Sequence, residues 1–269
     1  MDALPPVALA LGGLAVGFTV RRARLCSFGA IEDALVGGDW RRLKVFGLAL
    51  LVAIACTQGL ALAGLFDPAA TTYLPPRIAV VSAALGGALF GLGMAFVGTC
   101  AMGALVRLGG GDLRALVCLM VFGAVAYAAL RGVLAPWRID GLESLAWTVP
   151  GGRGSADALA AHLSGVQPGF LALLLALVLI PLVLARDARL RRAPRLLTAG
   201  AVLGLGVSGG WLLTGVLADE FDGDVRVQSL TFVAPVARAL YGSLLGTLDV
   251  TDFGVASVAG VALGAYLHA

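Results

Sequence analysis

The 269-residue chain is 59% hydrophobic and only 13% charged, with a formal net charge of +3. Soluble globular domains carry about 25% charged residues, so this composition leaves too little polar surface for a soluble protein of this size. The basic residues are scattered through short loops between apolar runs, which is typical of membrane topology, and we expect no nucleic-acid partner.

The apolar runs predict transmembrane helices along the whole chain. A hydrocarbon core of about 30 Å requires about 20 apolar residues per helix. Seven stretches approach this length: 5–20, 44–65, 78–99, 115–134, 167–185, 196–217 and 253–268. Three shorter stretches are expected to form short, broken or re-entrant helices inside the protein: 27–37, 101–108 and 228–246. The run at 171–185 does not alternate polar and apolar residues as a β-barrel strand would. We therefore predict an all-α integral membrane protein, a single polytopic bundle of roughly seven to nine transmembrane helices.

The loop charges predict an orientation. One set of loops holds 13 of the 19 Lys and Arg residues, including Arg21, Arg22, Arg24, Arg107 and Arg195. The positive-inside rule places these loops in the cytoplasm. The N-terminus and the loop 135–166 are then expected on the outer side.

Two segments share one pattern around a cysteine. Ala10–Ala30 and Ala84–Ala104 lie 74 residues apart and align without a gap at eight identical positions, including Gly13/Gly87, Gly17/Gly91, Cys26/Cys100 and Gly29/Gly103. A fainter copy at 200–215 aligns Gly200 with Gly87 and Gly204 with Gly91, and it has Leu213 in place of the cysteine. Such internal similarity is typical of transporters built from repeats.

These copies define approximate repeat units of 7–65, 80–134 and 196–268. On the predicted segment count, the first two copies start outside and the third starts inside, which indicates inverted halves. Two copies in the first half predict two in the second. A fourth unit is therefore expected, and no segment within residues 1–269 carries it.

The residues around the cysteines favour binding of an anion. Gly98 precedes Cys100 closely and is expected to break a helix, so a new helix starting near Thr99 or Cys100 would point its N–H groups and positive dipole end at the break. The same reasoning applies at Cys26, with a helix starting near Ser27. A thiol adds a weak donor and a soft, polarisable sulfur, which suits a small sulfur-containing anion better than a hard oxyanion.

The motif RxxxCxxGAxxD from Arg22 and the motif GxGMAxxGxCAxGxLxRLGxG from Gly91 resemble the YeeE/YedE family of sulfur-compound transporters. The resemblance implies uptake of thiosulfate or a related anion through the bacterial inner membrane, with cysteines contacting substrate by thiol hydrogen bonds. It also implies a cytoplasmic sulfur-handling protein as a partner. The candidate path residues are Cys26, Cys100, Thr99, Gly98, Arg24 and Ser27.

Two other functions stay open on the sequence. A cysteine-based membrane redox or sulfurtransferase enzyme would need a base, a resolving cysteine or a cofactor site, and no such motif is present, so we expect no catalytic residue and no cofactor. A metal site is not expected, because the four cysteines form no C-x-x-C motif. The other function is a non-transporting membrane subunit that needs a partner chain, as the expected fourth unit suggests.

Overall fold

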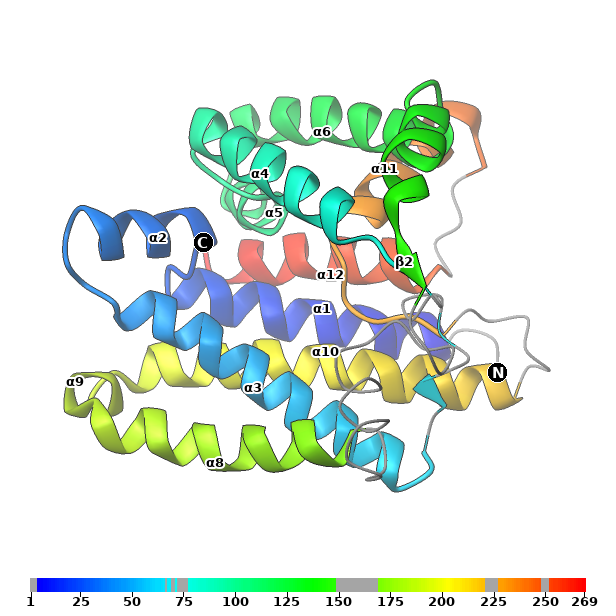
Figure 1. The fold of residues 1–269 in the computed structure, drawn as a ribbon. Coiled ribbons are helices and arrows are strands. Elements are labelled where there is room, and N and C mark those ends of the chain that lie inside the picture. The colour runs from blue at the N-terminus through cyan, green and yellow to red at the C-terminus, as the bar shows by residue number, and fades with distance from the viewer. Residues whose placement is uncertain are drawn as a thin grey trace.

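The computed structural model describes residues 4–65, 67–68, 71, 77–148, 169–220, 227–247 and 252–269. Its helices are α1 (Leu4–Arg22), α2 (Ser27–Leu35), α3 (Arg41–Leu62), α4 (Val80–Val97), α5 (Ala101–Gly109), α6 (Leu113–Arg131), α8 (Phe170–Arg186), α9 (Ala188–Arg191), α10 (Pro194–Glu220), α11 (Val233–Leu245) and α12 (Phe253–Leu267) (Figure 1). The short strands β1 (Arg77–Ile78) and β2 (Trp147–Thr148) pair antiparallel. The all-α prediction is confirmed.

Four stretches of the described chain are long and apolar enough to cross a membrane: Arg41–Leu62, Val80–Gly109, Leu113–Arg131 and Pro194–Gly215. The second of these contains the break between α4 and α5. Shorter apolar helices are Phe170–Arg186, Val233–Leu245 and Phe253–Leu267. The chain is therefore a multi-pass membrane protein. Part of the predicted loop 135–166 is helical, with turns η2 (Trp137–Leu142) and η3 (Glu143–Leu145), and residues 149–166 lie outside the described chain.

Each range predicted as a repeat unit holds a long, a short and a long helix. These are α1–α2–α3, α4–α5–α6 and α10–α11–α12. The end of α1, the residue after α4 and the start of α10 lie at the same end of the bundle, because Arg21, Gly98 and Arg195 line one cavity. Since α10 leaves the end at which α1 and α4 arrive, the third unit runs in the opposite direction, as inverted halves require.

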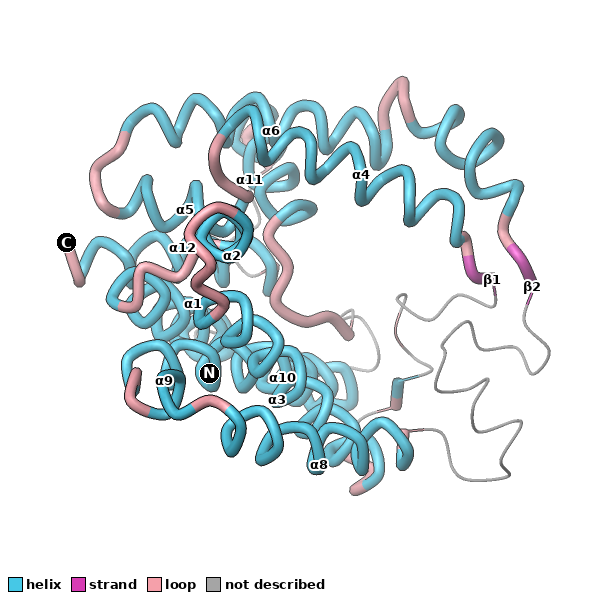
Figure 2. Tube along the Cα trace, turned by 60° about the vertical axis from the view of Figure 1, so that its left-hand side comes forward, coloured by secondary structure: helices cyan, strands magenta, loops and turns pink. Residues whose placement is uncertain are grey.

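The long helices pack side by side in the order α12, α1, α10, α3, α8 (Figure 2). The helices α5 and α11 both contact α12, and α6 contacts α5 and α11. Glycines allow the closest approach. A Cβ atom built on Gly13 or Gly17 would overlap the backbone carbonyl of Ser257 or Val261 in α12. The relation is reciprocal, because Cβ atoms on Gly260 and Gly264 would overlap backbone atoms of α1. Small residues spaced by four are typical of membrane helices whose backbones touch.

The third unit repeats this packing on a different helix. A Cβ atom on Gly200 would lie 3.1 Å from the carbonyl oxygen of Val45, and one on Gly204 would lie 2.6 Å from that of Ala49, both in α3. The sequence alignment makes these glycines the counterparts of Gly13 and Gly17. In the first unit, α1 therefore packs through Gly13 and Gly17 against α12 of the third unit. In the third unit, α10 packs through Gly200 and Gly204 against α3 of the first unit.

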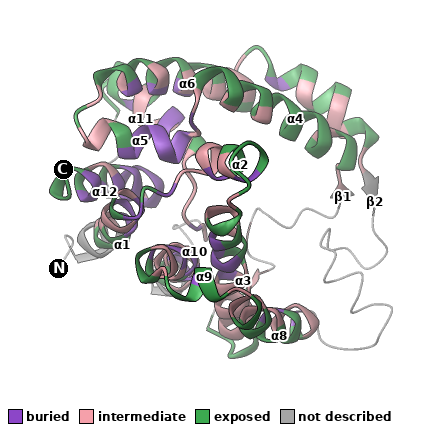
Figure 3. Cartoon of the chain, turned by 90° about the vertical axis from the view of Figure 1, so that its left-hand side faces the viewer, coloured by how far each residue is buried: buried purple, intermediate pink, exposed green. Residues whose placement is uncertain are grey.

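The second unit has no such contact in the described chain. Cβ atoms on Gly87 and Gly91 of α4 would have nothing within 4 Å, and α4 contains no buried residue. Figure 3 shows α4 exposed along its length, while the neighbouring α5 is mostly buried. The face that α1 and α10 use for packing is thus open on α4.

The α1–α12 contact predicts different outcomes at two adjacent glycines. We expect Gly13→Ala to lower the free energy of unfolding by about 1–3 kcal/mol, because the new methyl group overlaps backbone that cannot move aside. Gly12→Ala is the control, since a Cβ there has nothing within 4 Å and alanine favours helix. Thermal unfolding in detergent measures both. Equal stability of the two variants would contradict the packing described.

Candidate functional site

Two helix breaks lie where the cysteine motifs predict them. Arg24 adopts a left-handed backbone conformation with φ of 50°, which turns the chain from α1 towards α2, and Cys26 is the N-cap of α2. Gly98 ends α4 with φ of 72° and donates its N–H to the Met94 carbonyl at 2.8 Å. Cys100 is the N-cap of α5. Each cysteine therefore sits at the positive end of a nine-residue helix.

The two breaks face each other across Gly103. A Cβ atom on Gly103 would lie 3.5 Å from the Cys26 sulfur and would overlap the Thr99 hydroxyl oxygen. The Ser27 hydroxyl lies 3.9 Å from the Met94 sulfur, which links α2 to α4. Because Gly103 has no side chain, it leaves space between the Cys26 sulfur and the start of α5.

The two thiols differ in their surroundings. The Cys100 sulfur accepts a hydrogen bond from the Gly103 N–H at 3.5 Å, so it caps its own helix. The Cys26 side chain makes no capping hydrogen bond. Neither pairs in a disulfide, and both are partly buried. Of the two, Cys26 is the thiol without a capping hydrogen bond.

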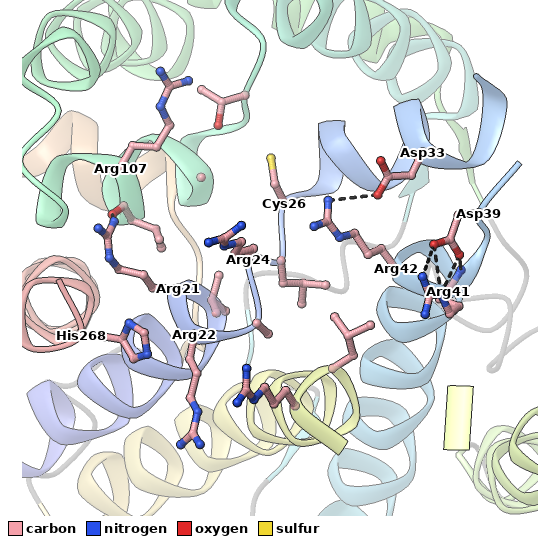
Figure 4. Close-up of a pocket in the computed structure, with 18 of the residues that line it drawn as sticks. Arg21, Arg22, Arg24, Cys26, Asp33, Asp39, Arg41, Arg42, Arg107 and His268 are labelled. Atoms are coloured by element: carbon pink, nitrogen blue, oxygen red, sulfur yellow. Dashed lines mark hydrogen bonds and ion pairs between the residues drawn. The ribbon is translucent and has the colours of Figure 1, made fainter. Parts of the chain in front are cut away.

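A cavity of about 970 Å³, called here the Cys26 cavity, opens beside these breaks. Cys26, Arg24 and Arg42 line it, and Figure 4 shows the Arg42 guanidinium directed towards Asp33. Seven arginines line it: Arg21, Arg22, Arg24, Arg41, Arg42, Arg107 and Arg195. All seven belong to the loops that the sequence analysis predicts on the cytoplasmic side.

Most of this positive charge has no carboxylate partner. Arg42 pairs with Asp33 at 3.0 Å, and Arg41 pairs with Asp39 at 2.6 Å. Arg107 pairs with Asp112 at 2.8 Å. The other four arginines, Arg21, Arg22, Arg24 and Arg195, form no ion pair within the described residues. The cavity therefore attracts anions.

Two carboxylates at this end, those of Asp39 and Asp112, have a lowered pKa. The hydrogen bond from the Arg41 side chain, with a second from the Arg41 backbone, lowers the pKa of Asp39 to about 2. The Arg107 side chain lowers the pKa of Asp112 in the same way. A group whose pKa is lowered by folding loses its pairing only as the pH falls through that value, so the Asp39–Arg41 pair persists throughout the physiological range.

Four of the six predicted path residues line the Cys26 cavity: Arg24, Cys26, Gly98 and Thr99. Cys100 and Ser27 adjoin it without lining it. The sequence analysis did not select Gly103 as a site residue, although its identity with Gly29 in the repeat was a usable signal. It also missed Arg195 and His268, which reach the cavity from α10 and from the residue after α12.

The remaining cysteines lie elsewhere. Cys56 is in α3 and Cys118 in α6, and neither lines the Cys26 cavity. Within the described residues no group of three His, Cys, Asp or Glu side chains is placed to hold a metal ion. The polar lining of the cavity consists of the seven arginines, the Cys26 thiol, the Thr99 hydroxyl, the His268 imidazole and the carboxylates of Asp33 and Asp39.

Comparisons with known proteins identify the family to which the chain is similar. A family model described as sulphur transport matches residues 22–269. The thiosulfate transporter TsuA of Spirochaeta thermophila is 33% identical over 129 residues, which are 47% of this chain and 37% of the relative. The Escherichia coli thiosulfate transporter TsuA is 29% identical over 110 residues, which are 41% of this chain and 30% of the relative. The aligned segments thus span about a third of the length of each of these relatives.

The position of Gly103 predicts how the cavity responds to one methyl group. We expect Gly103→Ala to slow alkylation of Cys26 by N-ethylmaleimide several-fold, in a protein whose other three cysteines are serine, because the methyl group occupies space beside the thiol. Gly29→Ala is the matched control, since its Cβ would lie 3.8 Å from the Cys26 Cβ and 3.7 Å from the Arg42 guanidinium, at ordinary contact distance. Equal alkylation rates would contradict the geometry.

Proposed function

Because this chain belongs to the sulphur transport family, we propose that it is a permease for a small sulfur-containing anion, thiosulfate, that passes through the Cys26 cavity on its way across the membrane. The family match confirms the resemblance identified from the two cysteine motifs. The family description and the names of the relatives specify transport, so the enzyme alternative is set aside. The two curated relatives are thiosulfate transporters, which supports this choice of anion.

One observation carries the proposal: an uncapped thiol at a helix N-terminus opens into a cavity lined by arginines. Thiosulfate carries two negative charges and a terminal sulfur. Arg22, Arg24 and the N-terminus of α2 offset the loss of hydration that the anion undergoes when it leaves water. The Cys26 S–H then donates a weak hydrogen bond to the ligand, and its sulfur contacts the soft sulfur of the anion.

Cys100 is the second proposed contact. Its sulfur lies at the start of α5, across Gly103 from Cys26, and it currently accepts the Gly103 N–H. A ligand that passes between the two breaks would meet first one thiol and then the other. No covalent bond to either sulfur is needed for this transfer, because each contact is a hydrogen bond.

The charge distribution supports a direction. We propose that the arginine-rich end faces the cytoplasm across a bacterial inner membrane, with the N-terminus outside. An anion that leaves through the Cys26 cavity would then arrive beside a strongly basic surface. A cytoplasmic sulfur-handling protein that collects the anion would dock at this end of the bundle.

A second candidate function rests on the open face of α4. The glycines of α1 and of α10 each pack against a helix of another unit, while Gly87 and Gly91 of α4 contact no helix among the described residues. This favours a subunit that completes its path only with a helix from a further unit. If this is correct, thiosulfate uptake appears only when a segment carrying the fourth unit of a relative is co-expressed. Uptake by this chain alone would support the first proposal.

The thiol contacts predict a selective loss of uptake. We expect Cys26→Ala and Cys100→Ala to abolish growth of a sulfur auxotroph on thiosulfate, because each removes a hydrogen-bond donor and the sulfur contact. Cys56→Ala is the control, because Cys56 is partly buried in α3 away from the cavity. Protein levels in membranes are measured in parallel. Equal growth of all three variants would contradict the proposed roles.

A further inference from the structure

A second cavity lies at the other end of the described bundle. It has a volume of about 520 Å³ and lies between the last turn of α6, the helix α11 and the start of α12. The end of α12 lies near the Cys26 cavity, where His268 is a lining residue, so the two cavities are separated by the length of α12. We propose that this second cavity, called here the Arg131 cavity, binds small divalent anions before they reach the cysteines. The inference rests on the proposed function for its place on the path.

Two arginines line the Arg131 cavity, and one has no partner. Arg131 makes no hydrogen bond or ion pair with any described residue. Arg238 donates from one terminal nitrogen to Asp252 at 3.1 Å. Its Nε is buried and has no hydrogen-bond partner among the described residues. A buried, unpaired guanidinium N–H is costly unless a ligand or water accepts from it.

The other charges nearby are already engaged. Asp252 is the acid that lines the cavity, and its Oδ1 also accepts the Val255 N–H that caps α12. Arg138 donates to the Ala129 carbonyl at 3.2 Å and pairs with Glu143, so its charge is offset outside the cavity. Among the described lining residues, two arginines accompany one carboxylate, which leaves one more positive than negative charge in that part of the wall.

The remaining wall offers hydroxyls and no thiol. The rings of Tyr127 and Tyr241 are stacked with centroids 4.2 Å apart, and Thr247 adds a further hydroxyl. The lining contains no cysteine. Guanidinium and hydroxyl donors recognise charge and oxygen geometry, so this cavity is expected to bind sulfate as well as thiosulfate. Selection of thiosulfate over sulfate then depends on Cys26 at the other end of the bundle.

The inverted relation of the units supports this assignment. In the first unit the ion pair Asp33–Arg42 joins the short helix α2 to α3 beside the Cys26 cavity. In the third unit the ion pair Arg238–Asp252 joins the short helix α11 to the start of α12 beside the Arg131 cavity. Each cavity is thus built at the junction of a short helix with the following long helix, at opposite ends of the bundle.

Protection from alkylation tests the site without requiring transport. The variant Leu130→Cys places a thiol in the Arg131 cavity, in the full chain with its four native cysteines replaced by serine. We expect millimolar sulfate to slow reaction of this thiol with N-ethylmaleimide several-fold, and chloride of equal ionic strength to have no such effect. Adding Arg131→Gln should remove the protection. Arg114→Gln is the matched control, because Arg114 is exposed and lines neither cavity.

Thiosulfate uptake distinguishes this inference from the proposed function. We expect Arg131→Gln to raise KM for uptake several-fold with little change at saturating substrate, since the chemistry at Cys26 is intact. Absence of sulfate protection, or protection that survives Arg131→Gln, would overturn the inference even if uptake is normal. Protection that depends on Arg131 in a chain without uptake would leave the anion site standing and contradict the proposed function alone.

Discussion

The contact between α1 and α12 determines where the site residues lie. Glycines of each helix rest on the backbone of the other, so the two axes approach more closely than side chains would permit. α1 leads directly into the turn at Arg24 and Cys26, while α12 packs against α5, where a Cβ on Gly109 would overlap the Ala262 carbonyl. α12 thereby ties the end of α1 to the helix that begins after Cys100.

On the proposed function, the two cavities would divide the recognition of an anion into two tasks, the recognition of its charge and the recognition of its sulfur. An anion that leaves water must regain favourable interactions for its charge, and arginines with helix N-termini provide these at the Cys26 cavity. Charge alone does not separate thiosulfate from sulfate. The Cys26 sulfur makes that separation possible, because it offers a soft contact that oxygen atoms do not match.

The open face of α4 places the second unit apart from the other two. The same two glycine positions that bury α1 on α12 and α10 on α3 are uncovered in α4. In lipid such a face gains little from the hydrophobic effect and is stabilised when another backbone approaches it. A helix that covered α4 as α12 covers α1 would run parallel to it, because Gly13 and Gly17 meet Ser257 and Val261 in the same order along both helices.

The sequence by itself determined the helical class, the two breaks and their cysteines. Apolar runs that do not alternate with polar residues form helices in a bilayer, and at the second break Gly98, with positive φ, is followed by a new N-cap within two residues, which is a local event. The correspondence of Gly13 and Gly17 with Gly200 and Gly204 is also visible in the sequence, as part of the internal repeat. These features depend on residues that are close together in the sequence, and they can therefore be predicted from it.

Only the tertiary structure decided what surrounds the breaks. Gly103 lies beside Cys26 because α5 and α2 meet, and Arg195 and His268 reach the same cavity from helices far away in the sequence. The Arg131 cavity likewise joins the end of α6 to α11 and α12. Such neighbours follow from how rigid helices pack and which end of each helix lies where, and no local pattern records that arrangement.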